Sequence, residues 1–157
     1  MMKNTNEFMT GKMTSFELRA QLVSIALEWE RRYGVSPAIT SAISEIDVAL
    51  LVGLTPEYFG VQNNGRTAVQ KGFDFMHDGL RYQVKANRPS GKPGSKVTIV
   101  SKANNYEWDL LVWVLYDREY NLLEAWQWNV QDYRSAFDSK KRIGPSDMRN
   151  GLRVSPK

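Results

Sequence analysis

An Asp-Gly dipeptide at positions 78–79 separates two segments, 73–77 and 80–86, in which apolar and polar residues alternate. This pattern predicts a β-hairpin with a two-residue turn, because both turn residues tolerate the positive φ angles that such a turn requires. A two-residue turn also fixes the strand register. The predicted pairs are His77–Leu80, Met76–Arg81, Phe75–Tyr82 and Asp74–Gln83.

The alternation predicts opposite characters for the two faces of this hairpin. Asp74, Gln83 and Lys85 share one face. The other face is apolar and is formed by Phe73, Phe75, Tyr82 and Val84. A carboxylate, an amide oxygen and an ammonium group in such proximity suit one hard divalent cation and a phosphate group. We therefore expect Asp74 and Gln83 to bind Mg²⁺ together with a backbone carbonyl and waters, and Lys85 to orient the attacking water.

Two helices are predicted before the hairpin. The first spans about residues 15–33 and ends at Gly34, which suits a left-handed C-terminal cap. The second begins after Pro37 and ends near Gly53. Glu45 lies in the second helix among small and apolar neighbours, so we expect it to face the packed side and to add a second carboxylate to the hairpin site.

The remaining pattern predicts one α/β domain with a central mixed sheet flanked by helices. Residues 55–71 carry mixed signals and support no assignment. The elements expected after the hairpin are strands at 97–100, 109–116 and 122–128 and a helix at 130–137. The expected organisation is a flexible N-terminus (1–13), the α/β domain (14–139) and a basic C-terminal tail (140–157).

Composition limits the chemistry and the partners. The chain has no cysteine, which excludes disulfides, thiolate metal sites and cysteine nucleophiles. No apolar segment approaches the roughly 20 residues that span a bilayer, so we expect a soluble, cytoplasmic protein. The net charge of +4 favours polyanionic partners. The basic residues expected to contact nucleic acid are Arg88, Lys92, Lys96, Lys102, Lys140, Lys141 and Arg142, although solvated loops and a frayed tail explain them equally well.

One further pattern links these residues. In chain order, the sequence contains Glu45, then Gly72-Phe73-Asp74, then Tyr82-Gln83-Val84-Lys85, and then an apolar strand after an aspartate, Trp108-Asp109-Leu110-Leu111-Val112. This order resembles the PD-(D/E)xK nuclease superfamily, and in particular its small bacterial members with a Glu, an Asp and a QxK triplet. The resemblance implies a restriction-endonuclease-like fold and metal-dependent hydrolysis of DNA, with Mg²⁺ or a substituting Mn²⁺.

By that resemblance Asp74, Gln83 and Lys85 are active-site residues, and Glu45 joins them from its helix. The sequence departs from the superfamily at two places. No proline precedes Asp74, and Gln83 replaces the usual acid, which removes one negative charge and lowers the expected metal affinity. Two alternatives therefore remain, a nuclease-fold module that binds nucleic acid without cutting it and a protein-interaction or accessory factor. A two-fold homodimer that cuts both strands of a duplex is a further hypothesis.

Overall fold

The chain divides at Pro37 into two units, residues 1–37 and 38–157. The computed structural model describes residues 13–64, 72–90 and 92–155. The first unit contains one described helix, α2 (Ser15–Tyr33), and the second contains the sheet and the other helices. The predicted flexible N-terminus, apart from Met13, lies outside the described residues. The boundary at Pro37 separates α2 from the remainder of the predicted domain.

Helix α2 has the bounds that the sequence predicts, because both of its ends are capped locally. The Thr14 hydroxyl accepts from the Glu17 backbone N–H at 3.1 Å, and the Glu17 carboxylate accepts from the Thr14 N–H at 3.0 Å. Gly34 adopts the expected left-handed conformation, with a φ of 74°. The apolar side chains at 4-3-4-4 spacing along this helix are exposed: Leu18, Leu22, Ile25, Trp29 and Tyr33.

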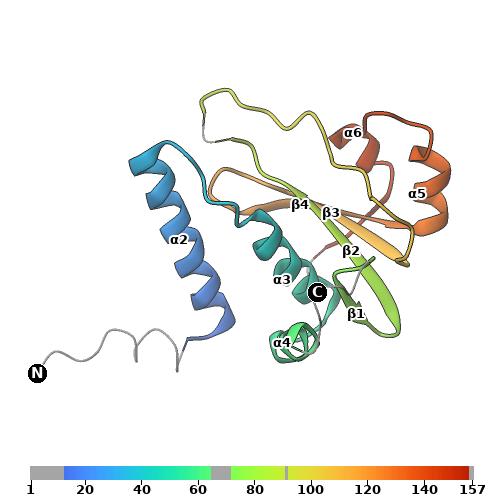
Figure 1. The fold of residues 1–157 in the computed structure, drawn as a ribbon, viewed down its shortest axis with the longest axis horizontal. Helices are drawn as coiled ribbons and strands as arrows, with labels where there is room; N and C mark the ends of the chain where they lie inside the picture. Colours follow the sequence, from blue (N-terminus) through green and yellow to red (C-terminus); the bar gives the residue numbers. More distant parts are fainter. Residues whose placement is uncertain (1–12, 65–71, 91, 156–157) are drawn as a thin grey trace, which may run out of the picture. The chain divides into compact units, whose positions relative to one another are not determined.

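The second unit is built on a five-stranded mixed sheet in which sequence order is also spatial order (Figure 1). Its strands are β1 (Phe75–His77), β2 (Leu80–Asn87), β3 (Leu110–Tyr116), β4 (Leu122–Asn129) and β5 (Leu152–Arg153). β2 and β3 run parallel, and the other neighbouring pairs are antiparallel. This arrangement confirms an α/β unit with a central mixed sheet.

The predicted hairpin is confirmed at its turn and at three of its four pairs. Asp78 and Gly79 have φ angles of 50° and 75°, and the pairing runs from His77 to Phe75 as predicted. The fourth prediction was wrong, because the ladder ends at Phe75 and the Asp74 N–H donates to the Tyr82 carbonyl at 2.7 Å. This local irregularity also moves Phe73 away from the apolar face that it was expected to share with Phe75.

Helices α3 (Thr40–Val52) and α4 (Pro56–Asn64) pack beside the start of the sheet. The Tyr116 hydroxyl on β3 donates to Asp47 Oδ2 on α3 at 2.6 Å, which fixes this helix over the sheet. α4 lies in the segment where the sequence supported no assignment. The Gln62 side chain on α4 accepts from the Met76 N–H at 2.8 Å and donates to the Met76 carbonyl at 2.7 Å. The backbone N–H and C=O of Met76 on the outer edge of β1 thus both have hydrogen-bond partners.

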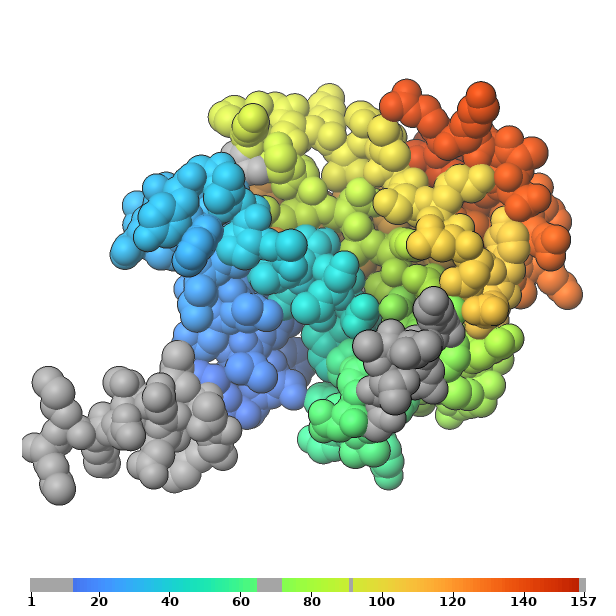
Figure 2. All heavy atoms as spheres, viewed as in Figure 1, coloured from blue at the N-terminus to red at the C-terminus, as the bar shows by residue number. Residues whose placement is uncertain are grey.

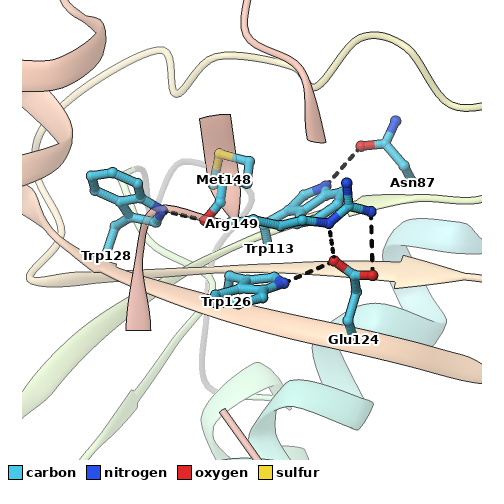
Figure 3. A network of polar contacts seen from close by, with 7 residues as sticks. All are labelled: Asn87, Trp113, Glu124, Trp126, Trp128, Met148 and Arg149. Carbon is cyan, nitrogen blue, oxygen red and sulfur yellow. Dashed lines mark hydrogen bonds and ion pairs between the residues drawn. The ribbon is translucent and has the colours of Figure 1, made fainter. Parts of the chain in front are cut away.

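The opposite face of the sheet holds an aromatic core beneath α5 (Val130–Phe137), whose bounds match the prediction. Phe73 packs against this core rather than beside Phe75. The buried members of this aromatic core are Val100, Trp108, Leu111, Trp113, Trp128, Tyr133, Phe137, Ile143 and Met148. Trp113 donates its indole N–H to Asn87 Oδ1 at 2.9 Å, and Trp128 donates to the Met148 carbonyl at 3.1 Å (Figure 3).

The basic segment after Ser139 is part of this folded unit. It supplies Ile143 and Met148 to the core, forms helix α6 (Pro145–Met148) and ends in β5.

The predicted strand at 97–100 was wrong, because Val100 alone forms an isolated bridge, to Ile143. Within the described residues, no helix is both long and apolar enough to cross a membrane.

Candidate active site

A polar cavity opens beside β2 where its pairing with β1 stops. β1 pairs only with residues 80–82, so the next residues of β2 lack a strand partner on that edge. The cavity has a volume of about 260 Å³. It is lined by Ser41, Ser44 and Glu45 of α3, by Asp74, by Gln83, Val84, Lys85 and Ala86 of β2, and by Ser101. All four residues that the sequence predicts for the site therefore lie around one cavity.

Strand register explains why residues from both faces of β2 line this cavity. Gln83 and Lys85 pair with Leu111 and Trp113, so they share the sheet face that carries the aromatic core. Val84 points the other way, toward the face that carries α3. Because the strand edge is open, α3 reaches the cavity from one face and Ser101 reaches it from the other. Figure 2 shows α3 in cyan, β2 in yellow-green and the segment around residue 101 in yellow meeting on the same side of this unit.

The carboxylate of Asp74 is held by the strand that carries the other site residues. Its Oδ2 accepts a hydrogen bond from the Val84 backbone N–H at 2.7 Å. Asp74 thus takes the place of a strand partner for this N–H group. The N–H and C=O of one strand residue point to the same edge, so the Val84 carbonyl is directed to this edge as well. The Val84 backbone carbonyl therefore adds one oxygen that can bind a metal ion to the side-chain oxygens of the cavity.

Glu45 lies on α3 as expected, and it is half-buried, as are Asp74, Gln83 and Lys85. Its neighbour Ser44 is only 2% exposed. The Ser44 hydroxyl donates to the Ser41 carbonyl at 3.0 Å within the helix, so this polar group is satisfied where it is buried. The cavity thus combines two carboxylates with one ammonium group and several neutral oxygens.

This donor set suits magnesium better than a transition metal. Carboxylate, amide and carbonyl oxygens are the ligands that a hard cation prefers, and magnesium retains several waters when proteins supply few ligands. In residues 13–64, 72–90 and 92–155, no cluster of three or more His, Asp or Glu side chains could hold a metal ion. Any magnesium bound here would depend on Glu45, Asp74, the Gln83 amide oxygen, a backbone carbonyl and water.

None of the seven basic residues predicted to contact nucleic acid lines the cavity. The side chains of three of them contact other parts of the protein instead. Arg88 donates to the Arg118 carbonyl from Nε at 2.8 Å and stacks on the Tyr120 ring at 4.5 Å. Lys102 donates to two carbonyls just beyond α5. Lys140 forms an ion pair of 2.6 Å with an aspartate. The other four are exposed: Lys92, Lys96, Lys141 and Arg142.

The serines of the cavity are the residues that sequence reasoning missed. Ser44 directly precedes Glu45, and this adjacency was the signal that could have placed it near the site. Ser101 had no such signal, because it lies in the irregular connection between β2 and β3.

A comparison with protein-family models and with curated proteins found no match. The chemistry of the site therefore follows from its own residues.

Proposed function

We propose that this chain is a metal-dependent endonuclease that hydrolyses phosphodiester bonds in DNA. The observation that supports this proposal is the convergence of Glu45, Asp74, Gln83 and Lys85 on one polar cavity. Two carboxylates and an amide oxygen suit a hard cation, and a neighbouring ammonium group suits the charge of a phosphate.

Each residue has a distinct role in the proposed reaction. A bound magnesium or manganese ion would supply Lewis-acid activation of the phosphodiester and of a coordinated water. Asp74 and Glu45 would hold the ion by charge, and the Gln83 side-chain oxygen would complete the protein ligands. Lys85 would orient the attacking water and stabilise the negative charge that develops on the phosphate oxygens.

We also propose membership of the PD-(D/E)xK nuclease superfamily, with its restriction-endonuclease-like fold. A mixed sheet with helices on both faces supports this proposal at the level of architecture. The order of Glu45, Asp74 and the Gln83-Val84-Lys85 triplet supports it at the level of the site. The net charge of +4 agrees with a DNA partner.

A second function, DNA binding without cleavage, is favoured by one specific feature. Gln83 is neutral, so the cavity has two carboxylates where a third would strengthen metal binding. A site of this kind could retain affinity for phosphates while losing the ion that hydrolysis needs.

The test is cleavage of supercoiled plasmid, branched DNA and single-stranded DNA with magnesium, with manganese and with EDTA. We expect metal-dependent cutting by the wild type and its loss in Asp74→Ala and Lys85→Ala. Arg134→Ala on α5 is the control for loss of a positive charge, since Arg134 is exposed, lies outside the cavity and is not among the residues expected to contact nucleic acid. Binding without any cutting would favour the second function. Light scattering of the protein on duplex DNA would show whether a dimer forms.

A further inference from the structure

The chain on either side of Ser101 is tethered to the fold at three points. Asn87 on β2 donates its side-chain N–H to the Ile99 carbonyl at 3.0 Å. The Val100 N–H donates to the Ile143 carbonyl at 2.8 Å. Lys102 donates to the carbonyls that follow α5, at 2.7 Å for Lys140 and 3.2 Å for Asp138. These bonds hold an irregular segment in a fixed path across the open edge of β2.

Ser101 is the residue of this segment that lines the cavity. It is exposed, whereas Val100 before it is 3% exposed and belongs to the aromatic core. The tethers thus hold Ser101 at the wall of the cavity, on the face opposite α3. Because the chain is fixed on both sides of Ser101, little backbone entropy is lost when its side chain binds a ligand.

A phosphodiester in this cavity needs such a donor. Glu45 and Asp74 repel a phosphate unless a cation lies between, and Lys85 is the one cationic side chain among the described lining residues. The Ser44 hydroxyl is committed to a carbonyl of its own helix. A serine hydroxyl can donate to a non-bridging phosphate oxygen, and hydrogen bonds with a charged partner are stronger than neutral ones.

We propose that Ser101 is a substrate-binding residue whose hydroxyl donates to a non-bridging phosphate oxygen of the bound DNA strand. This inference rests on the proposed function, because it takes a phosphodiester as the ligand. Ser101 fixes the phosphate relative to Asp74 and Lys85, and it contributes to binding more than to the chemical step.

The experiment compares wild type, Ser101→Ala and Ser101→Thr, with Ser135→Ala as the control at an exposed serine of α5 outside the cavity. Binding of fluorescein-labelled single-stranded and duplex oligonucleotides is measured by anisotropy with calcium in place of magnesium. We expect Ser101→Ala to weaken binding at least about 10-fold, as for loss of one hydrogen bond to a charged group. Ser101→Thr keeps the hydroxyl, so its binding should stay within about twofold of wild type, as should that of Ser135→Ala.

Cleavage kinetics in magnesium provide a second readout. Ser101→Ala should raise KM by a similar factor and leave kcat within about twofold, because the hydrogen bond is made to the bound substrate as well as to the transition state. Thermal melting of each variant establishes that the fold is retained.

The outcomes separate the two proposals. If wild type binds DNA and Ser101→Ala binds equally well, the role of Ser101 is overturned and the proposed function is unaffected. Equal weakening in Ser101→Ala and Ser101→Thr would overturn the role of the hydroxyl. If wild type neither binds nor cuts any DNA, the proposed function and this inference both fail.

Discussion

The Val84 backbone N–H donates a hydrogen bond of 2.7 Å to Oδ2 of Asp74, and this contact joins the residue that precedes β1 to the strand of Gln83 and Lys85. It replaces a ladder hydrogen bond with a side-chain one just beyond the last β1–β2 pair, Phe75–Tyr82. A carboxylate that accepts a backbone N–H is oriented as well as bound. The same residue is therefore part of the fold and of the candidate site, and the two roles can be separated by substitution.

Asp74→Asn should strongly reduce cleavage while preserving the fold. The asparagine Oδ1 can still accept from Val84, but the residue no longer supplies charge for a cation, so we expect activity to fall at least about 100-fold. Asp74→Ala should also destabilise the protein by about 1 kcal/mol, because the Val84 N–H loses its partner. Plasmid cleavage and urea unfolding measure the two effects. Near wild-type cleavage by Asp74→Asn would contradict the role of Asp74.

The elements that the sequence predicts correctly are those with local causes. The Asp78-Gly79 turn determines the hairpin by its own backbone preferences, and Gly34 and Gly53 end their helices in the left-handed conformation. The failures depend on distant partners. β5 is a two-residue strand that exists because β4 offers it an edge, and residues 97–99 form no strand, since Val100 alone makes a bridge, to Ile143.

The residues of the candidate site also fall into two groups, those that the local sequence predicts and those whose position depends on distant contacts. Gln83 and Lys85 follow from hairpin alternation, and Glu45 follows from helical periodicity. Ser101 could not be predicted, because its position depends on tethers to Asn87, Ile143 and the carbonyls after α5. Those contacts span long stretches of sequence and leave no periodic pattern.

Gln83→Glu should strengthen metal binding. The substitution adds a carboxylate to a cavity that already holds two, and divalent cations bind more tightly as ligand charge increases. We expect the magnesium concentration for half-maximal cleavage to fall about tenfold, since added ligand charge tunes affinity over decades. Gln131→Glu on α5 is the matched control, because it adds the same charge outside the cavity. An unchanged magnesium requirement in Gln83→Glu would argue against metal binding at this position.

The stability of the sheet should depend on pH through Glu124. Hydrogen bonds from Arg149, at 2.6 Å, and from the Trp126 indole, at 2.9 Å, lower the pKa of the Glu124 carboxyl, although burial opposes this effect (Figure 3). A lowered pKa in the folded state stabilises the protein above the unfolded pKa of 4.5, and this contribution is lost as the pH falls through the folded-state pKa.

Glu124→Gln should therefore be less stable than wild type at pH 7, and the difference should shrink below about pH 4. Urea unfolding between pH 7 and pH values below about 4 measures the difference in the free energy of unfolding between Glu124→Gln and wild type. Glu57→Gln on α4 is the control, because Glu57 is exposed. A difference that stays constant from pH 7 to strongly acidic conditions would show that the carboxylate charge does not contribute.

Gly151→Ala should destabilise the C-terminal part of the sheet. A Cβ atom at this position would lie 2.5 Å from Trp128 Nε1 and 2.7 Å from the Gln127 carbonyl oxygen, and the second of these is backbone that cannot rotate away. The clash also falls on the indole that donates to the Met148 carbonyl. We expect the free energy of unfolding to fall by about 1–3 kcal/mol, as at other overpacked sites. The measurement is urea unfolding, in which the midpoint should fall while the dependence of the free energy on urea concentration stays unchanged.

Gly60→Ala is the matched control for this substitution. A Cβ atom at Gly60 meets nothing within 4 Å, and the residue lies inside helix α4, where alanine is favoured over glycine by about 0.5–1 kcal/mol. The same chemical change should therefore stabilise the protein slightly at Gly60 and destabilise it at Gly151. If both variants unfold at the wild-type midpoint, β5 and the turn before it do not pack against Trp128 tightly enough to contribute to the fold.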